Sequence, residues 1–182
     1  VNLALTDGEI LGLIGPNGAG KSSLVKAIAQ LLPYRGRIDL HGHSLARMAP
    51  RYRATQVAYL AQGDQLHWPI TVEDLVALGR YPFRGGWRQR RGAGQAADRK
   101  AVEWALHHTG MQALRTRRVD EISGGERARA RLARALAVQA PVLLADEPVA
   151  ALDPRHQLKV MELLAGQRRQ GRMVIVVLHD LT

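Results

Sequence analysis

One stretch constrains this chain more than any other: an apolar run that breaks into glycines and resumes after a lysine. Residues 9–14 (EILGLI) are predicted to form a buried strand, and residues 21–32 (KSSLVKAIAQLL) a helix. Between them, Gly15 to Ser22 follow the pattern G-x-x-x-x-G-K-S. A strand before and a helix after are the context in which this pattern forms a phosphate-binding loop. The alternative is a glycine-rich turn without a ligand.

The residue types of this loop suit a nucleoside triphosphate. Glycines let the backbone approach a ligand closely, so that successive N–H groups cradle phosphate oxygens at the positive end of the helix. Lys21 is predicted to contact the β- and γ-phosphates, and Ser22 to offer its hydroxyl to Mg²⁺. The residues predicted to bind the nucleotide are Gly15, Pro16, Asn17, Gly18, Ala19, Gly20, Lys21, Ser22 and Ser23.

Two acidic residues end a second apolar run, VLLADEP at residues 142–148. We expect this strand to be a neighbour of the strand before the loop. Asp146 is then placed to hold the hydration shell of Mg²⁺, and Glu147 to polarise an attacking water as general base. Taken alone, the pattern is also typical of an ordinary strand end; the glycine–lysine loop favours the functional interpretation.

A third motif, ISGGERARARLARAL, begins at residue 122. Ser123 is predicted to cap the helix, with Glu126 as its capping-box partner. The free N–H groups at such a helix start also form an anion site, and the two roles are compatible.

The remaining pattern indicates an α/β fold. Runs at residues 56–62, 141–146 and 172–180 are apolar and separated by helical segments, which predicts a parallel sheet covered on both faces. Residues 34–42 are expected to form an antiparallel arm. Residues 69–138 are mostly helical in pattern: Thr71 and Asp74 form a cap-like pair, a glycine- and arginine-rich loop covers 80–95, and helices cover 97–110 and 154–171.

Composition narrows the possible partners. The 182 residues carry a formal charge of +10, which favours an anionic partner: nucleotide, nucleic acid or membrane surface. There is no cysteine, which fits a reducing compartment, and no run approaches the ~20 apolar residues of a membrane-spanning helix. Because the chain starts at Val1 inside an apolar pattern and stops at Thr182 after a strand, we expect a fragment truncated at both ends.

Six segments resemble the motifs of the ATP-binding cassette (ABC) ATPases, the nucleotide-binding subunits of ABC transporters. In order along the chain, they are GPNGAGKSS, YLAQ, ISGGE, VLLADEP, AALD and VLHD. The resemblance implies a single P-loop NTPase domain with a mainly parallel sheet, an antiparallel β arm and an inserted α-helical subdomain. The RecA-like core would comprise residues 1–68 and 126–182, and the helical signature subdomain about 69–125.

The resemblance also implies roles that the residues alone do not give. Gln62 contacts Mg²⁺ and the attacking water, and His179 contacts the γ-phosphate. Catalysis is therefore expected from Glu147, His179 and Gln62, and metal binding from Ser22, Gln62 and Asp146. The signature residues Ser123, Gly124, Gly125 and Glu126 bind ATP held by the opposite subunit, and Asp153 lies in the loop that crosses the dimer interface.

The implied assembly is a homodimer that binds ATP and Mg²⁺ on the cytoplasmic face of the inner membrane, as a peripheral partner of permease subunits and, indirectly, of a periplasmic binding protein. Residues 71–85 (TVEDLVALGRYPFRG) resemble importers of iron–siderophore complexes, haem and vitamin B12. A non-transport ABC ATPase acting on nucleic acid or the ribosome is the alternative, although no nucleic-acid partner is expected. Arg84, Arg88, Arg90 and Arg91 would meet lipid headgroups or simply lie in a solvated loop.

Three departures from the family pattern stand out. Ile122 replaces the usual leucine, and Ala150 stands where many members have a serine that bonds across the dimer. The aromatic residue that stacks on adenine in the family would precede the first strand, outside this sequence.

Overall fold

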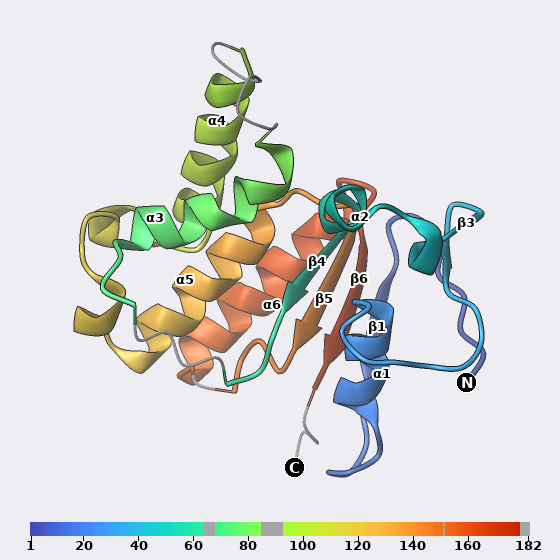
Figure 1. Cartoon of the computed structure of the whole chain (residues 1–182). Coiled ribbons are helices and arrows are strands. Elements are labelled where there is room, and N and C mark those ends of the chain that lie inside the picture. The colour runs from blue at the N-terminus through green and yellow to red at the C-terminus, as the bar shows by residue number, and fades with distance from the viewer. Residues whose placement is uncertain (64–67, 85–92, 151, 179–182) are drawn as a thin grey trace. The chain divides into compact units, whose positions relative to one another are not determined.

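The computed structural model in Figure 1 describes residues 1–63, 68–84, 93–150 and 152–178. They form two compact units, each of which is described by itself. The first unit contains Val1–Gln62, Ala140–Pro148 and Leu164–Thr182, and the second contains Gly63–Gln139 and Val149–Leu163. The division into an ATP-binding core and a signature subdomain with the predicted boundaries stays a prediction.

A four-stranded parallel sheet forms the centre of the first unit. Its strands lie in the order β1 (Ile10–Leu13), β6 (Met173–Val177), β5 (Val142–Asp146) and β4 (Val57–Leu60). Every residue of β5 and β6 is buried, as expected for parallel strands whose two faces are both covered. The predicted α/β class is confirmed.

Strand β1 departs from its prediction. It was expected to be buried, but its side chains alternate between exposed and half-buried, and Ile10 is 38% exposed. Among the described strands, β1 pairs only with β6 and therefore forms an edge of the sheet.

Helix α1 (Lys21–Ile28) packs on β5 and β6. Its Val25 is fully buried in a cluster with Leu144, Ile175 and Val177. The helix is shorter than the predicted 21–32, because Gln30 takes a left-handed conformation with φ 61° that ends the helical path.

A small antiparallel arm follows α1 in the same unit, as predicted, but its strands lie within residues 39–44 and not 34–42. Its strands are β2 (Asp39–Leu40) and β3 (His43–Ser44), joined by a tight turn. The short helices that continue from it, η1 (Leu45–Arg47) and α2 (Pro50–Gln56), were not predicted. Helix α2 packs on β4.

The second unit is helical. Helix α5 (Gly124–Ala137) contacts three other helices of this unit: α3 (Val72–Ala77), η2 (Leu78–Phe83) and α4 (Ala93–His108). The short turns η3 (Gln112–Leu114) and η4 (Val119–Glu121) lead into α5, and α6 (Pro154–Arg168) begins in this unit. Leu75, Leu106, Leu132 and Leu136 are nearly or fully buried and supply much of its core.

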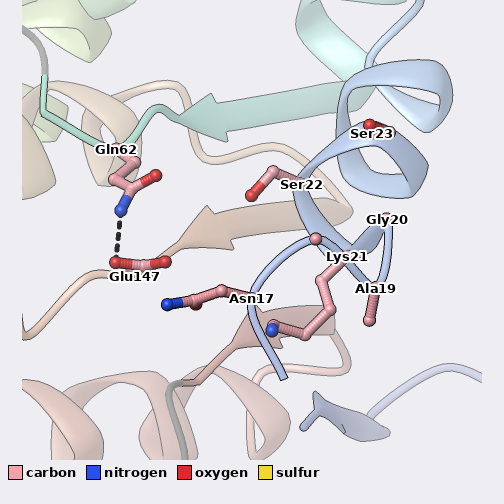
Figure 2. A pocket seen from close by; sticks show the side chains of 9 residues that line it. Asn17, Ala19, Gly20, Lys21, Ser22, Ser23, Gln62 and Glu147 are labelled. Carbon is pink, nitrogen blue, oxygen red and sulfur yellow. Dashed lines mark hydrogen bonds between the residues drawn. The ribbon is translucent and has the colours of Figure 1, made fainter. Parts of the chain in front are cut away.

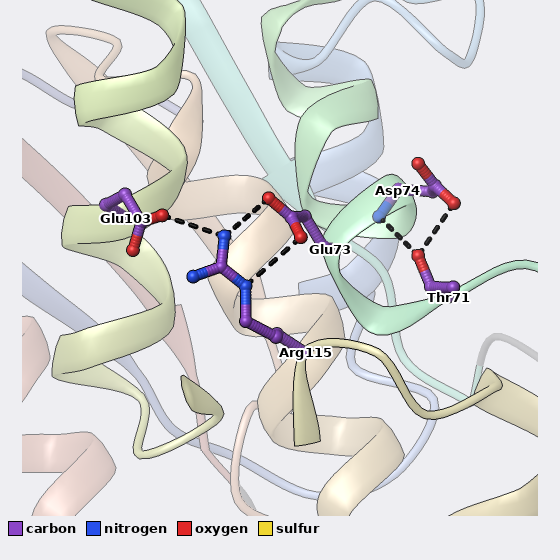
Figure 3. A network of polar contacts seen from close by, with 5 residues as sticks. All are labelled: Thr71, Glu73, Asp74, Glu103 and Arg115. Carbon is purple, nitrogen blue, oxygen red and sulfur yellow. Dashed lines mark hydrogen bonds and ion pairs between the residues drawn. The ribbon is translucent and has the colours of Figure 1, made fainter. Parts of the chain in front are cut away.

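Two local predictions in this unit have different outcomes. The cap at Thr71 is confirmed, because its hydroxyl accepts a hydrogen bond from the Asp74 amide at 3.1 Å (Figure 3). The loop predicted over 80–95 is wrong at both ends, since η2 continues to Phe83 and α4 begins at Ala93. Arg88, Arg90 and Arg91 lie outside the described residues. Among the helices that the structure describes, none is long and apolar enough to cross a membrane.

Candidate nucleotide-binding site

The glycine–lysine loop joins β1 to α1 in the predicted order. Gly18 and Gly20 have φ values of 82° and 85°, a region that glycine adopts without the penalty of a Cβ atom. Gly20 is also the N-cap of α1, and it has no side chain to accept a bond from the first helical turn. The loop therefore leaves N–H groups of that turn for an anion.

Lys21 folds back over this loop. Its ammonium group donates to the carbonyl of Pro16 at 2.9 Å and to the carbonyl of Gly15. Figure 2 shows the side chain running along the inside of the loop, on the same side as Asn17. A positive charge therefore lies where phosphate oxygens would meet the loop.

Ser22 connects the loop to the acidic end of β5. The expectation that β5 neighbours the strand before the loop is wrong, because β6 lies between β1 and β5. The first turn of α1 bridges the gap instead: Ser22 Oγ donates to Asp146 Oδ1 at 2.9 Å. Asp146 is only 1% exposed, whereas Ser22 is half-buried and lines the cavity, so the bond joins a buried carboxylate to the cavity wall.

Tyr59 is a residue of this site that the sequence interpretation missed. Its hydroxyl donates to the other oxygen of Asp146, Oδ2, at 3.4 Å. Tyr59 lies on β4 in register with Leu144, two residues before Asp146 on the adjacent strand. The available signal was a polar-tipped aromatic in an otherwise apolar strand, because a buried tyrosine hydroxyl usually finds a partner.

Gln62 and Glu147 face each other across the cavity in front of the loop (Figure 2). The Gln62 amide donates to the Glu147 carboxylate. Glu147 has φ 51°, unusual for a non-glycine residue, and its own amide donates to Val177 O at 3.2 Å. Such a backbone conformation costs of order 1–3 kcal/mol and persists where the surroundings fix it, often at functional sites.

The cavity has a volume of about 410 Å³. All of its lining residues belong to the first unit. They are Asn17, Gly18, Ala19, Gly20, Lys21, Ser22, Ser23, Gln62 and Glu147. The structure thus brings together the predicted loop, the glutamine and the acidic pair, and Gly15 and Pro16 adjoin the cavity through Lys21.

The predicted signature lies at the start of α5, in the second unit. The Ser123 amide donates to the Glu126 carboxylate at 2.8 Å, and the Glu126 amide donates to Ser123 Oγ at 3.3 Å. This confirms the predicted capping box. The same backbone N–H of Ser123 holds the pKa of Glu126 below its usual value. Gly124 and Gly125 form the first turn.

Asp153 precedes α6 and caps it. Its carboxylate accepts from the His156 amide at 3.0 Å and bonds the His156 ring at 2.7 Å. These two bonds lower the pKa of Asp153, the ring contact most strongly. Gln157 donates to Leu152 O at 2.9 Å and so holds the preceding turn. His179, predicted to contact the γ-phosphate, lies outside the described residues.

Comparison with known proteins defines the class of protein. The family described as ABC transporter matches residues 1–150. The hemin import ATP-binding protein HmuV of Streptomyces coelicolor is 43% identical over all 182 residues, which span 63% of that protein. The iron(3+)-hydroxamate import ATP-binding protein FhuC of Bacillus subtilis is 37% identical over the whole chain, which spans 66% of it.

A solved structure has the same architecture. The ATP-binding cassette MJ0796, a dimer in a post-hydrolysis state bound to ADP and Pi, has a TM-score of 0.84 at 28% identity, covering all of this chain and 79% of that one. The fold is that of a P-loop NTPase. The chain belongs to the ABC transporter family, and it spans slightly less than two thirds of the first two relatives' lengths.

Proposed function

We propose that this chain is the ATP-binding and ATP-hydrolysing part of an ABC importer. The observation that carries the proposal is the hydrogen bond from Ser22 to Asp146, which joins the glycine–lysine loop to a buried carboxylate beside Glu147 and Gln62. Triphosphate, metal and attacking water are each matched by groups around one cavity. The relatives' names, which specify ATP binding and import, support the same reading.

The loop residues 15–23 would hold the phosphates, with Lys21 against the β- and γ-phosphates. Mg²⁺ prefers oxygen ligands in near-octahedral geometry, and Ser22 Oγ, Asp146 and the Gln62 amide oxygen are the available oxygens. Bound Mg²⁺ would neutralise charge on the phosphates. Glu147 would accept a proton from the attacking water, and its bond to Gln62 keeps it directed into the cavity.

The proposed assembly is a homodimer in which Ser123 to Glu126 of one copy, with Asp153 beside the interface, complete the site of the other. Permease subunits would bind the dimer at the cytoplasmic face of the inner membrane, and a periplasmic binding protein would act through them. His179 is proposed to contact the γ-phosphate. Chelated iron, haem or cobalamin is the proposed cargo class, because residues 71–85 resemble that importer group and the relatives import hemin and iron hydroxamate.

Replacing Glu147 tests the assignment directly. In the complete protein, Glu147→Gln is expected to lower ATP turnover by about 10²- to 10⁴-fold, the usual contribution of a general base. ATP affinity should change little, because the loop and Lys21 remain. Phosphate release under saturating Mg–ATP measures the first quantity, and equilibrium titration with ATP the second.

Glu162→Gln is the matched control, because it replaces a carboxylate by an amide at an exposed position on α6. It should leave turnover unchanged. Equal turnover in Glu147→Gln and in the control would remove Glu147 from the proposed role.

A further inference from the structure

Arg80 is a buried cation of the second unit and does not line the nucleotide cavity. It belongs to η2, and its side chain is 6% exposed. One guanidinium nitrogen, Nη1, donates to both Ala137 O and Val138 O at 2.9 Å. Ala137 is the last residue of α5 and Val138 is its C-cap, a position where carbonyls have no partner further along the helix.

The same guanidinium has two further contacts. Its Nε donates to Asp98 on α4 at 2.9 Å, and its central carbon, Cζ, lies 3.7 Å from the ring centre of Phe83. Arg80 thus connects η2, α4 and the C-terminal end of α5 at one point. A buried ion pair is often no more stabilising than well-packed apolar residues, so stability alone does not account for this choice of residues.

Gly79 brings η2 directly onto α5. A Cβ atom at this position would lie 2.3 Å from Arg134 O and 3.2 Å from the Ala137 side chain. Because the first of these atoms is backbone, no larger residue fits unless η2 and α5 separate. Two adjacent residues therefore fix the same end of α5, one by close approach and one by hydrogen bonds.

The opposite end of α5 carries Ser123. A helix of 14 residues is about 21 Å long, so a tilt of about 10° at the Arg80 end would move the Ser123 end by roughly 4 Å. A misplacement of about 1 Å in a catalytic group can lower turnover about 10²-fold. The attachment at Gly79 and Arg80 is therefore in a position to control where the signature points.

We propose that Gly79 and Arg80 are positioning residues for the signature: they set the direction of α5 and thereby the placement of Ser123. This rests on the proposed function, in which Ser123 binds ATP held by a second copy. The proposal assigns Arg80 no contact with nucleotide. A positioning role accounts for the packing of Gly79 and Arg80 against the C-terminal part of α5.

Two variants of the complete protein test the proposal by different means. Arg80→Lys keeps the charge but loses the fork that reaches two carbonyls and Asp98, and Gly79→Ala forces η2 from α5 without changing any charge. Each should lower turnover at least tenfold with ATP affinity unchanged, because the glycine–lysine loop belongs to the other unit. Amide hydrogen exchange over residues 124–128 should become faster.

Val102→Ala is the control. Val102 is buried on α4, and its truncation destabilises the same unit while Gly79, Arg80 and the groups that Arg80 hydrogen-bonds keep their residue types. Its thermal midpoint serves as the reference for the other two. If the control and the two variants lose equal turnover at equal loss of thermal stability, Gly79 and Arg80 only stabilise the fold and the proposal is overturned.

If Arg80→Lys does not fold, Gly79→Ala carries the test. If the unmodified protein hydrolyses no ATP, the proposed function fails, and the exchange measurement still decides whether the pair orders α5. Unchanged exchange at residues 124–128 in both folded variants would contradict the positioning role whatever the turnover.

Discussion

At the scale of single residues, the hydrogen bonds of Asp146 connect the glycine–lysine loop to the parallel sheet. Its two oxygens accept from Ser22 and Tyr59, and it has almost no exposed surface. Both partners are hydroxyl donors, so they orient the carboxylate without placing a positive charge beside it. This orientation is consistent with the proposed role of Asp146 beside Mg²⁺.

Ser22→Ala tests the proposed Mg²⁺ site. The variant loses both the bond to Asp146 and one proposed metal ligand, so the Mg²⁺ concentration for half-maximal hydrolysis should rise about tenfold or more, in line with the ~1.5–3 kcal/mol of a hydrogen bond to a charged group. Titration of turnover with Mg²⁺ at saturating ATP measures it.

Ser44→Ala removes a hydroxyl from β3 in the arm, away from the residues that line the cavity, and provides the control. An Mg²⁺ dependence that is the same in Ser22→Ala and in this control would show that the hydroxyl does not ligate the ion.

Several of these residues were predictable and others were not, for physical reasons. Lys21, Ser22, Asp146 and Glu147 belong to local patterns whose chemistry depends on sequence spacing. The role of Tyr59 depends on strand register between β4 and β5, which is a property of the folded sheet. The left-handed backbone of Glu147 is likewise imposed by contacts such as its bond to Val177 O.

At the scale of elements, the start of α5 combines a helix cap with a proposed binding function. The Glu126 carboxylate is stabilised by the Ser123 amide, so its pKa is lower in the folded protein than in the unfolded chain. Its contribution to stability is therefore fully present above the unfolded pKa, about 4.3, and is lost as the pH falls through the folded value.

Glu126→Gln should thus lower the free energy of unfolding at neutral pH by less than about 1 kcal/mol, since the carboxylate is largely solvated. The difference in unfolding free energy between the variant and the unmodified protein should shrink as the pH falls below the unfolded pKa of Glu126. Urea unfolding at a series of pH values measures both. A difference that stays constant down to the lowest pH would contradict a stabilised carboxylate at this cap.

Helix caps were predicted correctly from the sequence, whereas strand order and strand exposure were not. Caps at Thr71 and Ser123 were found because they depend on residues three positions apart. The exposure of β1 and the position of β6 between β1 and β5 were not, because strand order is set by packing between distant segments. Helix α4 began earlier than expected, since glycine lowers helix propensity without preventing a helical turn.

At the scale of the whole molecule, the glycine–lysine loop and the signature belong to different compact units of one chain. Under the proposed function they meet in one site only when two copies associate, each providing its loop to one nucleotide and its signature to the other. In a symmetric dimer of this kind, two sites form and each draws residues from both copies.

Mixing two inactive variants tests this claim most directly. Lys21→Ala should abolish the loop function and Ser123→Arg the signature function, so each variant alone should hydrolyse ATP at background rate. In an equal mixture about half of the dimers are hybrids, and each hybrid regains one site built from the intact Lys21 of one copy and the intact Ser123 of the other. The mixture is expected to recover about a quarter of normal turnover when the two sites act independently. A mixture no more active than either variant alone would contradict a site shared between two copies.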